Sequence, residues 1–287
     1  MDQAVCCYRH PDRETGIRCT RCERPICPAC MVSASVGFQC PECVGQSGRG
    51  GARAAVPRTV AGGRVAQGDP FLITKLLIGL NVAVFALELA LGNRLVNDLG
   101  LYAVCAPPQY GHVCAGVADG QWYRVLTSAF LHDRTNYAHI GFNMLSLWWI
   151  GAPLEQRLGR ARYTALYFVS AFGASAAVLL IAPGSLTLGA SGAIFGLFGA
   201  TAVYMRRLRY DMRPIVILLG LNILFSFTWA NVSWQAHLGG LVAGTLVAIG
   251  MMYAPRERRD VVQWGTAGAV LAVSLILTVI AVAQVTP

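Results

Sequence analysis

The chain has 287 residues, of which 55% are hydrophobic and only 13% are charged, and its mean hydropathy is +0.51. This balance leaves too little polar surface for a soluble protein of this size, so it predicts an all-α polytopic membrane protein that spans a lipid bilayer. The net charge of +9 comes mostly from arginines placed between apolar runs, which argues against nucleic acid as a partner.

Three zones along the chain differ in composition. Residues 1–44 are polar and rich in cysteine, residues 45–69 are rich in glycine, arginine and alanine, and the hydrophobic remainder begins at residue 70. The middle zone is expected to be a flexible linker. Because nothing in residues 1–44 is typical of a secretory signal, we expect this first zone to stay in the cytosol.

The cysteines of the first zone form pairs with metal-ligand spacing. Four such pairs in a reducing compartment predict two structural Zn²⁺ ions in tetrahedral sites. The pattern resembles a B-box type zinc finger, in which the pairs alternate between the two ions; sequential pairing is the alternative, and Cys6 could replace Cys7. With so few large apolar residues, this zone should fold only around metal. Alternation would group Cys7, His10, Cys27 and Cys30 around one ion, and Cys19, Cys22, Cys40 and Cys43 around the other.

The hydrophobic zone contains seven apolar stretches, each expected to be a membrane helix. The fourth is too short to span, so the segment before it should dip into the membrane beside protein or water. The stretches are residues 71–92, 137–153, 163–182, 191–204, 214–230, 234–253 and 262–283.

The loop arginines predict an orientation, because short cytosolic loops carry the excess of positive charge. Ten arginines lie in the loops at residues 155–162, 206–213 and 256–259, against three in residues 93–136. We therefore expect a plasma-membrane protein with a cytosolic N-terminus and an extracytoplasmic C-terminus. Residues 93–136 would then be extracytoplasmic, where Cys105 and Cys114 could form a disulfide. His112 and His132 of this loop are expected to be structural or surface residues.

Polar side chains inside apolar helices are costly and therefore point to function. Ser191, His237 and His139 all lie roughly 22 to 28 Å from the predicted inner boundary, at about one depth. A serine hydroxyl needs a neighbouring base to become a nucleophile, and histidine suits that task near neutral pH. Ser191 and His237 fit these two roles. A carboxylate third member is not expected, unless Glu88 or a loop acid supplies it.

Glycines could bring the two candidate residues together. Close approach of two helices requires small residues at the contact, and GxxxG spacing occurs twice: at Gly192 and Gly196, and at Gly240 and Gly244.

An oxyanion that develops during acyl transfer needs hydrogen-bond donors. His139 and Asn143 lie at i and i+4, on one face of a predicted helix, and the backbone N–H of Ser191 at a helix start is a third candidate.

Five motifs in order resemble the rhomboid intramembrane proteases. They are GQWYRVLTSAFLH at 120–132, AHIGFN at 138–143, EQRLG at 155–159, GASG at 189–192 and AHLGGLVAG at 236–244. The resemblance implies a six-helix core over residues 70–254, followed by a seventh helix within residues 255–287. It also implies cleavage of transmembrane proteins within or near their membrane segments, without a catalytic cofactor.

The resemblance also assigns residues. Ser191 of the GASG motif, which begins at Gly189, would be the nucleophile and His237 the base, while His139 and Asn143 would contribute to the oxyanion hole. Phe195 departs from the tyrosine that is common in the family, although it can still stack near His237. Trp122 and Arg124 match the tryptophan and arginine of the family's first loop only approximately.

Glu155 and Arg157 should brace a cytosolic loop. The first zone could bind a cytosolic protein partner. The alternative function is a non-proteolytic membrane adaptor or chaperone on the same fold, which would normally have lost the serine or the histidine.

Overall fold

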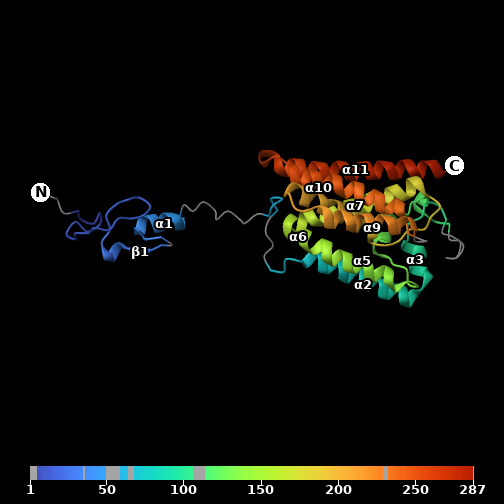
Figure 1. The fold of residues 1–287 in the computed structure, drawn as a ribbon, viewed down its shortest axis with the longest axis horizontal. Coiled ribbons are helices and arrows are strands. Elements are labelled where there is room, and N and C mark those ends of the chain that lie inside the picture. Colours follow the sequence, from blue (N-terminus) through green and yellow to red (C-terminus); the bar gives the residue numbers. More distant parts are fainter. Residues whose placement is uncertain are drawn as a thin grey trace. The chain divides into compact units, whose positions relative to one another are not determined.

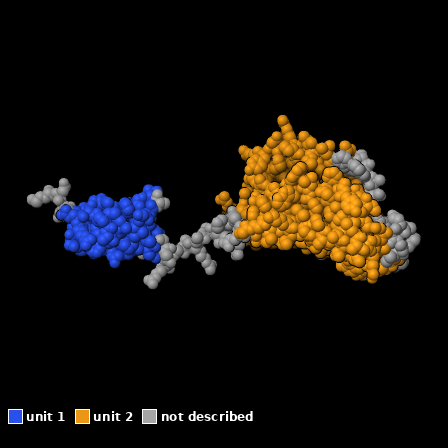
Figure 2. All heavy atoms as spheres, turned by 90° about the horizontal axis from the view of Figure 1, so that it is seen from below, with its two compact units in different colours: residues 1–57 blue, residues 58–287 orange. Residues whose placement is uncertain are grey.

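The computed structural model describes residues 5–34, 36–49, 59–63, 68–105, 114–228 and 232–286. The chain divides into two compact units, Met1–Pro57 and Arg58–Pro287, which Figure 2 distinguishes by colour. Each unit has its own buried cluster.

The first unit is built around cysteines. A two-stranded antiparallel sheet pairs β1 (Val32–Ser33) with β2 (Phe38–Gln39), and the short helices η1 (Pro28–Cys30) and α1 (Pro41–Arg49) flank it. Six cysteines and Ile26 form its buried cluster. So few large apolar side chains give this unit only a small core, and small units of this kind usually need further links such as disulfides or bound metal.

The second unit is a bundle of helices (Figure 1). In chain order these are α2 (Leu72–Leu91), α3 (Asn93–Leu99), η3 (Val117–Asp119), α4 (Arg124–Thr127), η4 (Ser128–Phe130), α5 (Tyr137–Ser146), the π-helical η5 (Leu147–Gly151), α6 (Ala152–Leu158), α7 (Arg160–Ile181), α8 (Ser191–Arg207), α9 (Arg213–Thr228), α10 (Trp234–Tyr253), η6 (Arg256–Arg258) and α11 (Arg259–Val285).

Each of the seven predicted apolar stretches coincides with a helix of this bundle. Within the described residues, four helices are long and apolar enough to cross a membrane: α2, α7, α10 and the run Arg256–Val285. The others are the continuous helical run α5–η5–α6 and the shorter α8 and α9. The predicted class, an all-α polytopic membrane protein with a cysteine-rich N-terminal domain, is confirmed.

The helices differ in how deeply they are buried. Of the best apolar windows, 61% is buried in α7 and 56% in α10, against 28% in α2 and 22% in α11. Nearly all of α8 up to Ala200 is buried as well. In Figure 1, α11 and α2 lie at opposite edges of the bundle. The inner helices α7, α8 and α10 therefore form the buried centre on which a site could be held.

Part of the expected linker is packed against this bundle. Ala61 is only 2% exposed, and its carbonyl accepts a hydrogen bond from Gln263 Nε2 of α11 at 2.8 Å. A side chain at Gly63 would collide with the carbonyl of Leu158. Residues 59–63 thus differ from the flexibility expected throughout residues 45–69, because buried contacts hold them.

Candidate functional site

Ser191 and His237 are in direct contact. Ser191 is the first residue of α8 and His237 lies in the first turn of α10. The Ser191 Oγ and His237 Nε2 atoms are 2.8 Å apart, which is the reach required between a nucleophile and its general base. Both side chains are only partly buried, so a substrate could approach them.

Glycines allow this contact, as the sequence suggested. A Cβ atom on Gly240 of α10 would collide with the backbone of Gly192 on α8, and one on Gly244 would collide with the backbone of Gly196. Gly196 is also close to a third helix, because a Cβ atom on it would collide with the side chain of Ser170 on α7. The two GxxxG pairs therefore face each other and bring the backbones of α8 and α10 together.

Phe195 fixes one face of the imidazole. It lies one turn after Ser191 and is 3% exposed. Its ring stacks on His237 with centroids 4.0 Å apart and an interplanar angle of 9°. This parallel contact limits rotation of the His237 side chain, so the phenylalanine retains the stacking function without a hydroxyl.

His139 lies near Ser191, beside Gly189. Its Nδ1 accepts a hydrogen bond from the backbone N–H of Asp133 at 3.3 Å, so the proton is assigned to Nε2. A Cβ atom built on Gly189 would lie 2.9 Å from His139 Nε2 and 3.7 Å from Ser191 Oγ. Gly189 has φ +123°, a conformation that favours glycine, and it leaves this space open for a reacting group.

Asn143 lies one turn below His139 on the same helix. It is 6% exposed, and its Nδ2 donates to the His139 carbonyl at 3.0 Å. The expected i, i+4 arrangement on one helix face is therefore present, with the amide held by its own helix.

Two acidic or basic residues of the sequence analysis take different positions from those considered. His132 is fully buried and its ring lies 5.1 Å from that of His139, so the surface alternative is wrong. The Glu88 carboxylate accepts a hydrogen bond from the backbone N–H of His132, at 3.0 Å to each oxygen. It is therefore bound to His132 and not to His237. His112 lies outside the described residues.

A hydroxyl takes the place that a carboxylate would have had. Ser226 Oγ of α9 is hydrogen-bonded to His237 Nδ1. The sequence alone gives no reason to select Ser226, because a lone serine in an apolar helix usually bonds only to its own backbone. The contact can be recognised only once α9 is known to bring Ser226 beside His237 of α10.

The part of the chain that carries these residues matches a known protein family. The family profile described as Rhomboid domain matches residues 119–254, which contain Ser191, His237, His139 and Asn143. The putative rhomboid protease YdcA of Bacillus subtilis is 34% identical over 151 residues, covering 50% of this chain and 74% of that protein. The chain belongs to the rhomboid family. The rhomboid protease AarA of Providencia stuartii is 25% identical over 223 residues, covering 65% of this chain and 75% of that protein.

Another relative shares a smaller part of its length. The rhomboid protease GluP of Bacillus subtilis is 35% identical over 137 residues, which are 46% of this chain but only 26% of GluP. This chain therefore matches only about a quarter of the length of GluP.

The connection between α2 and α5 contains the buried side chain of Arg124. This side chain is 1% exposed, donates to the Gly100 carbonyl at 2.8 Å, and lies 4.3 Å above the Tyr102 ring. Trp122, by contrast, is 42% exposed. In the same loop, a disulfide joins Cys105 to Cys114.

Glu155 and Arg157 lie at the opposite end of the rhomboid helices. The buried Glu155 carboxylate accepts the backbone N–H groups of Ile73 and Thr74, each at 2.9 Å, and so caps the positive N-terminus of α2. Arg157 lies 4.7 Å above the ring of Tyr204. Both contacts brace the ends of helices rather than the region around Ser191.

The zinc-ligand candidates form two groups in the first unit. Within each group the ligand atoms lie within 4.8 Å of one another, and the grouping alternates along the chain. Cys7, not Cys6, belongs to the first group. The groups are Cys7, His10, Cys27 and Cys30, and Cys19, Cys22, Cys40 and Cys43.

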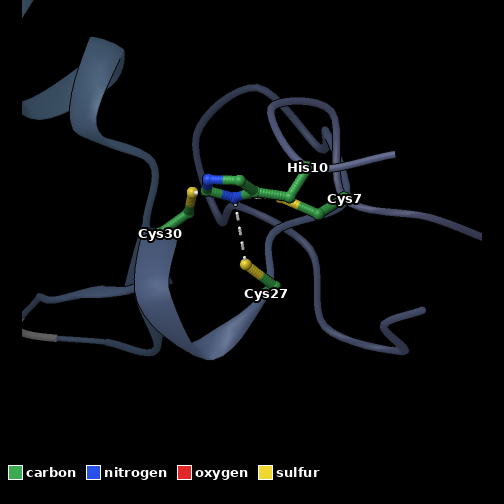
Figure 3. A group of neighbouring side chains, drawn as sticks. All are labelled: Cys7, His10, Cys27 and Cys30. Atoms are coloured by element: carbon green, nitrogen blue, oxygen red, sulfur yellow. Dashed lines mark hydrogen bonds between the residues drawn. The ribbon is translucent and has the colours of Figure 1, made fainter. Parts of the chain in front are cut away.

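The separations within these groups fit a tetrahedral metal ion. His10 Nδ1 lies 3.4 Å from Cys27 Sγ and 3.3 Å from Cys30 Sγ, and Figure 3 shows these side chains converging. Zn–S and Zn–N bonds of usual length in a tetrahedron would separate sulfur from nitrogen by about 3.6 Å. Cys22 Sγ and Cys40 Sγ are 3.8 Å apart, close to the roughly 3.8 Å expected for two sulfur ligands.

Proposed function

We propose that the chain is an intramembrane serine endopeptidase that cleaves transmembrane proteins within or near their membrane segments. The observation that carries this proposal is the 2.8 Å contact between Ser191 Oγ and His237 Nε2, at the N-terminal ends of two helices that pack closely through glycines. Membership of a family that includes rhomboid proteases supports the same reaction.

The reaction follows from the two side chains. Ser191 Oγ attacks the carbonyl carbon of the scissile peptide bond while its proton passes to His237 Nε2. The tetrahedral intermediate collapses, the C–N bond breaks, and His237 gives the proton to the leaving amine. Water then hydrolyses the acyl-enzyme with the same histidine as base, which regenerates the Ser191 hydroxyl and releases the carboxylate product.

The space beside Gly189 is where the oxyanion would develop. His139 Nε2–H faces it, and the backbone N–H of Ser191 at the start of α8 is a second donor. We assign Asn143 as a third donor, which would have to turn its amide from the His139 carbonyl toward the substrate. Donors held in place before reaction stabilise the transition state at low reorganisation cost.

The proposal includes a topology and a division of the chain. Residues 70–254 form the protease core and residues 255–287 a seventh transmembrane helix. From the excess of arginines in its short loops we infer a plasma-membrane protein in which residues 1–44 and the end of the bundle around Glu155 lie in the cytosol and the C-terminus lies outside. Ser191 then lies near the outer face, where the Cys105–Cys114 disulfide can form.

The N-terminal unit would hold two structural zinc ions. Its two buried groups offer four thiolates, or three thiolates and one imidazole, which are the ligands of closed structural zinc sites. The ions would supply folding free energy rather than catalysis, and the folded unit would bind a cytosolic protein.

A cleavage assay in liposomes with a model transmembrane substrate tests the proposal. We expect wild-type protein to cleave, and Ser191→Ala and His237→Ala each to abolish cleavage with little change in thermal stability. Because the two residues act as one unit, the double variant should be no worse than either single variant. A wild-type protein that cleaves nothing, together with unchanged partner binding by Ser191→Ala, would instead support the adaptor function.

A further inference from the structure

The imidazole of His237 has a second hydrogen-bond partner besides Ser191. Ser226 lies on α9 and is 4% exposed, and its Oγ is hydrogen-bonded to His237 Nδ1. The same oxygen lies 2.7 Å from the carbonyl oxygen of Asn222, one turn earlier on α9. The site is therefore a chain of contacts from α9 through α10 to Ser191 on α8.

The direction of these hydrogen bonds follows from the number of protons. A carbonyl oxygen can only accept, so the Ser226 O–H donates to Asn222. The hydroxyl has no second proton, so it must accept from His237, and Nδ1 carries the hydrogen. Nε2 then presents its lone pair to Ser191, which is the tautomer that a general base requires.

We propose that Ser226 is a positioning residue of the catalytic site, a hydroxyl that holds His237 in the tautomer and orientation needed to take the proton of Ser191. This inference rests on the proposed protease function. Ser226 acts together with Phe195: the phenyl ring restrains the plane of the imidazole, and the hydroxyl restrains rotation within that plane. No carboxylate among the described residues is recorded in contact with His237 Nδ1, so the hydroxyl occupies the position that an acid has in Ser-His-Asp triads.

Ser226→Ala tests the proposal, with kcat and KM measured on a model transmembrane substrate in liposomes. We expect kcat to fall by about 10- to 100-fold with KM nearly unchanged, because the base is misoriented while substrate binding is intact. Ser226→Thr should restore most of the rate, since threonine keeps a hydroxyl that can bond to the preceding turn. Ser226→Val, which has the shape of threonine without the hydroxyl, should behave as alanine.

Ser274→Ala is the matched control. Ser274 is also 4% exposed in an apolar helix, and its hydroxyl bonds to the Val270 carbonyl of its own helix at 2.9 Å. Loss of this hydroxyl should leave kcat unchanged. If Ser226→Ala does not accumulate as folded protein, the comparison of Ser226→Thr with Ser226→Val gives the same answer at nearly constant volume.

The outcomes separate this inference from the protease function. The positioning function is overturned if the wild type is active and both Ser226→Ala and Ser226→Val keep kcat within about twofold of the wild-type value. That result would leave the assignment of the Ser191/His237 pair intact. An equal loss in Ser226→Thr and Ser226→Val also overturns it, since the side-chain shape and not the hydroxyl would then matter. A wild type without cleavage overturns the protease function itself.

Discussion

Gly189 shapes the candidate site through its missing side chain. Its φ of +123° and the short distance from its Cβ position to His139 Nε2 mean that alanine would strain the backbone and displace the imidazole. We expect Gly189→Ala to lower cleavage at least about 100-fold and to lower the free energy of unfolding by about 1–3 kcal/mol. Both are measurable by substrate cleavage and thermal unfolding in detergent.

Gly184→Ala is the control, because Gly184 precedes α8 in the same connection and has no atom within 4 Å of its Cβ position. It should change neither quantity appreciably. Normal cleavage by Gly189→Ala would show that the space beside His139 is not where the oxyanion forms.

At the residue scale, the sequence predicts the site residues that lie in recognisable motifs. It does not predict those whose role depends on which helices pack together. Ser191, His237 and His139 could be selected because each is a polar residue in an apolar segment at one depth. Ser226 could not, because its contact with His237 requires α9 to lie against α10. For His132 the sequence allows either a structural or a surface position, and its burial depends on its packing against Phe85 and His139.

The contact between α8 and α10 is the feature of the bundle most sensitive to added volume. A Cβ atom on Gly240 would collide with the Gly192 backbone, which cannot move as a flexible side chain can. We expect Gly240→Ala to lower the free energy of unfolding by about 1–3 kcal/mol and to reduce cleavage, because the helices that carry Ser191 and His237 would separate. Thermal unfolding in detergent measures the first effect.

Gly268→Ala on α11 is the matched control, since its Cβ position has no neighbour within 4 Å. Alanine is the better helix former, so stability should stay constant or rise by up to about 1 kcal/mol. A Gly240→Ala protein as stable and active as this control would contradict the close packing of α8 and α10.

At the element scale, the seven apolar stretches predicted the helices because hydrophobicity over such lengths leaves few other structures in a membrane. Departures from regular α-helix within these stretches were less predictable. The π-helical η5 in the second stretch, for example, has no clear sequence signal. The docking of residues 59–63 on α11 was also missed, since a composition of glycine and alanine does not reveal the Gln263 side chain that binds the Ala61 carbonyl.

At the scale of the whole molecule, the number of zinc ions per chain tests the two-site assignment of the N-terminal unit. We expect about two zinc ions per chain, because eight ligands form two tetrahedral groups. Cys19→Ser should lower the content to about one ion, while Cys6→Ser should leave it unchanged, since Cys6 lies outside both groups. Elemental analysis of purified protein measures these ratios, and a wild-type value of none or one would contradict the two-site assignment.

Deletion of residues 1–44 tests whether the units act separately. Every residue assigned to the catalytic site lies in the unit Arg58–Pro287, and a domain with its own core can work alone. We expect the truncated protein to cleave a model substrate at a rate within about twofold of the full chain. A stably folded truncation that has lost cleavage would show that the N-terminal unit is coupled directly to the protease.

The central claim is that Ser191 is a nucleophile activated by His237, and covalent labelling tests it most directly. Purified protein would be treated with a fluorophosphonate, which forms a stable adduct with an activated serine, and the modified residue would be located by peptide mass spectrometry. We expect one adduct per chain on Ser191, strongly slowed labelling of His237→Ala, and none of Ser191→Ala. An adduct on another residue, or labelling of Ser191→Ala at the wild-type rate, would contradict the account.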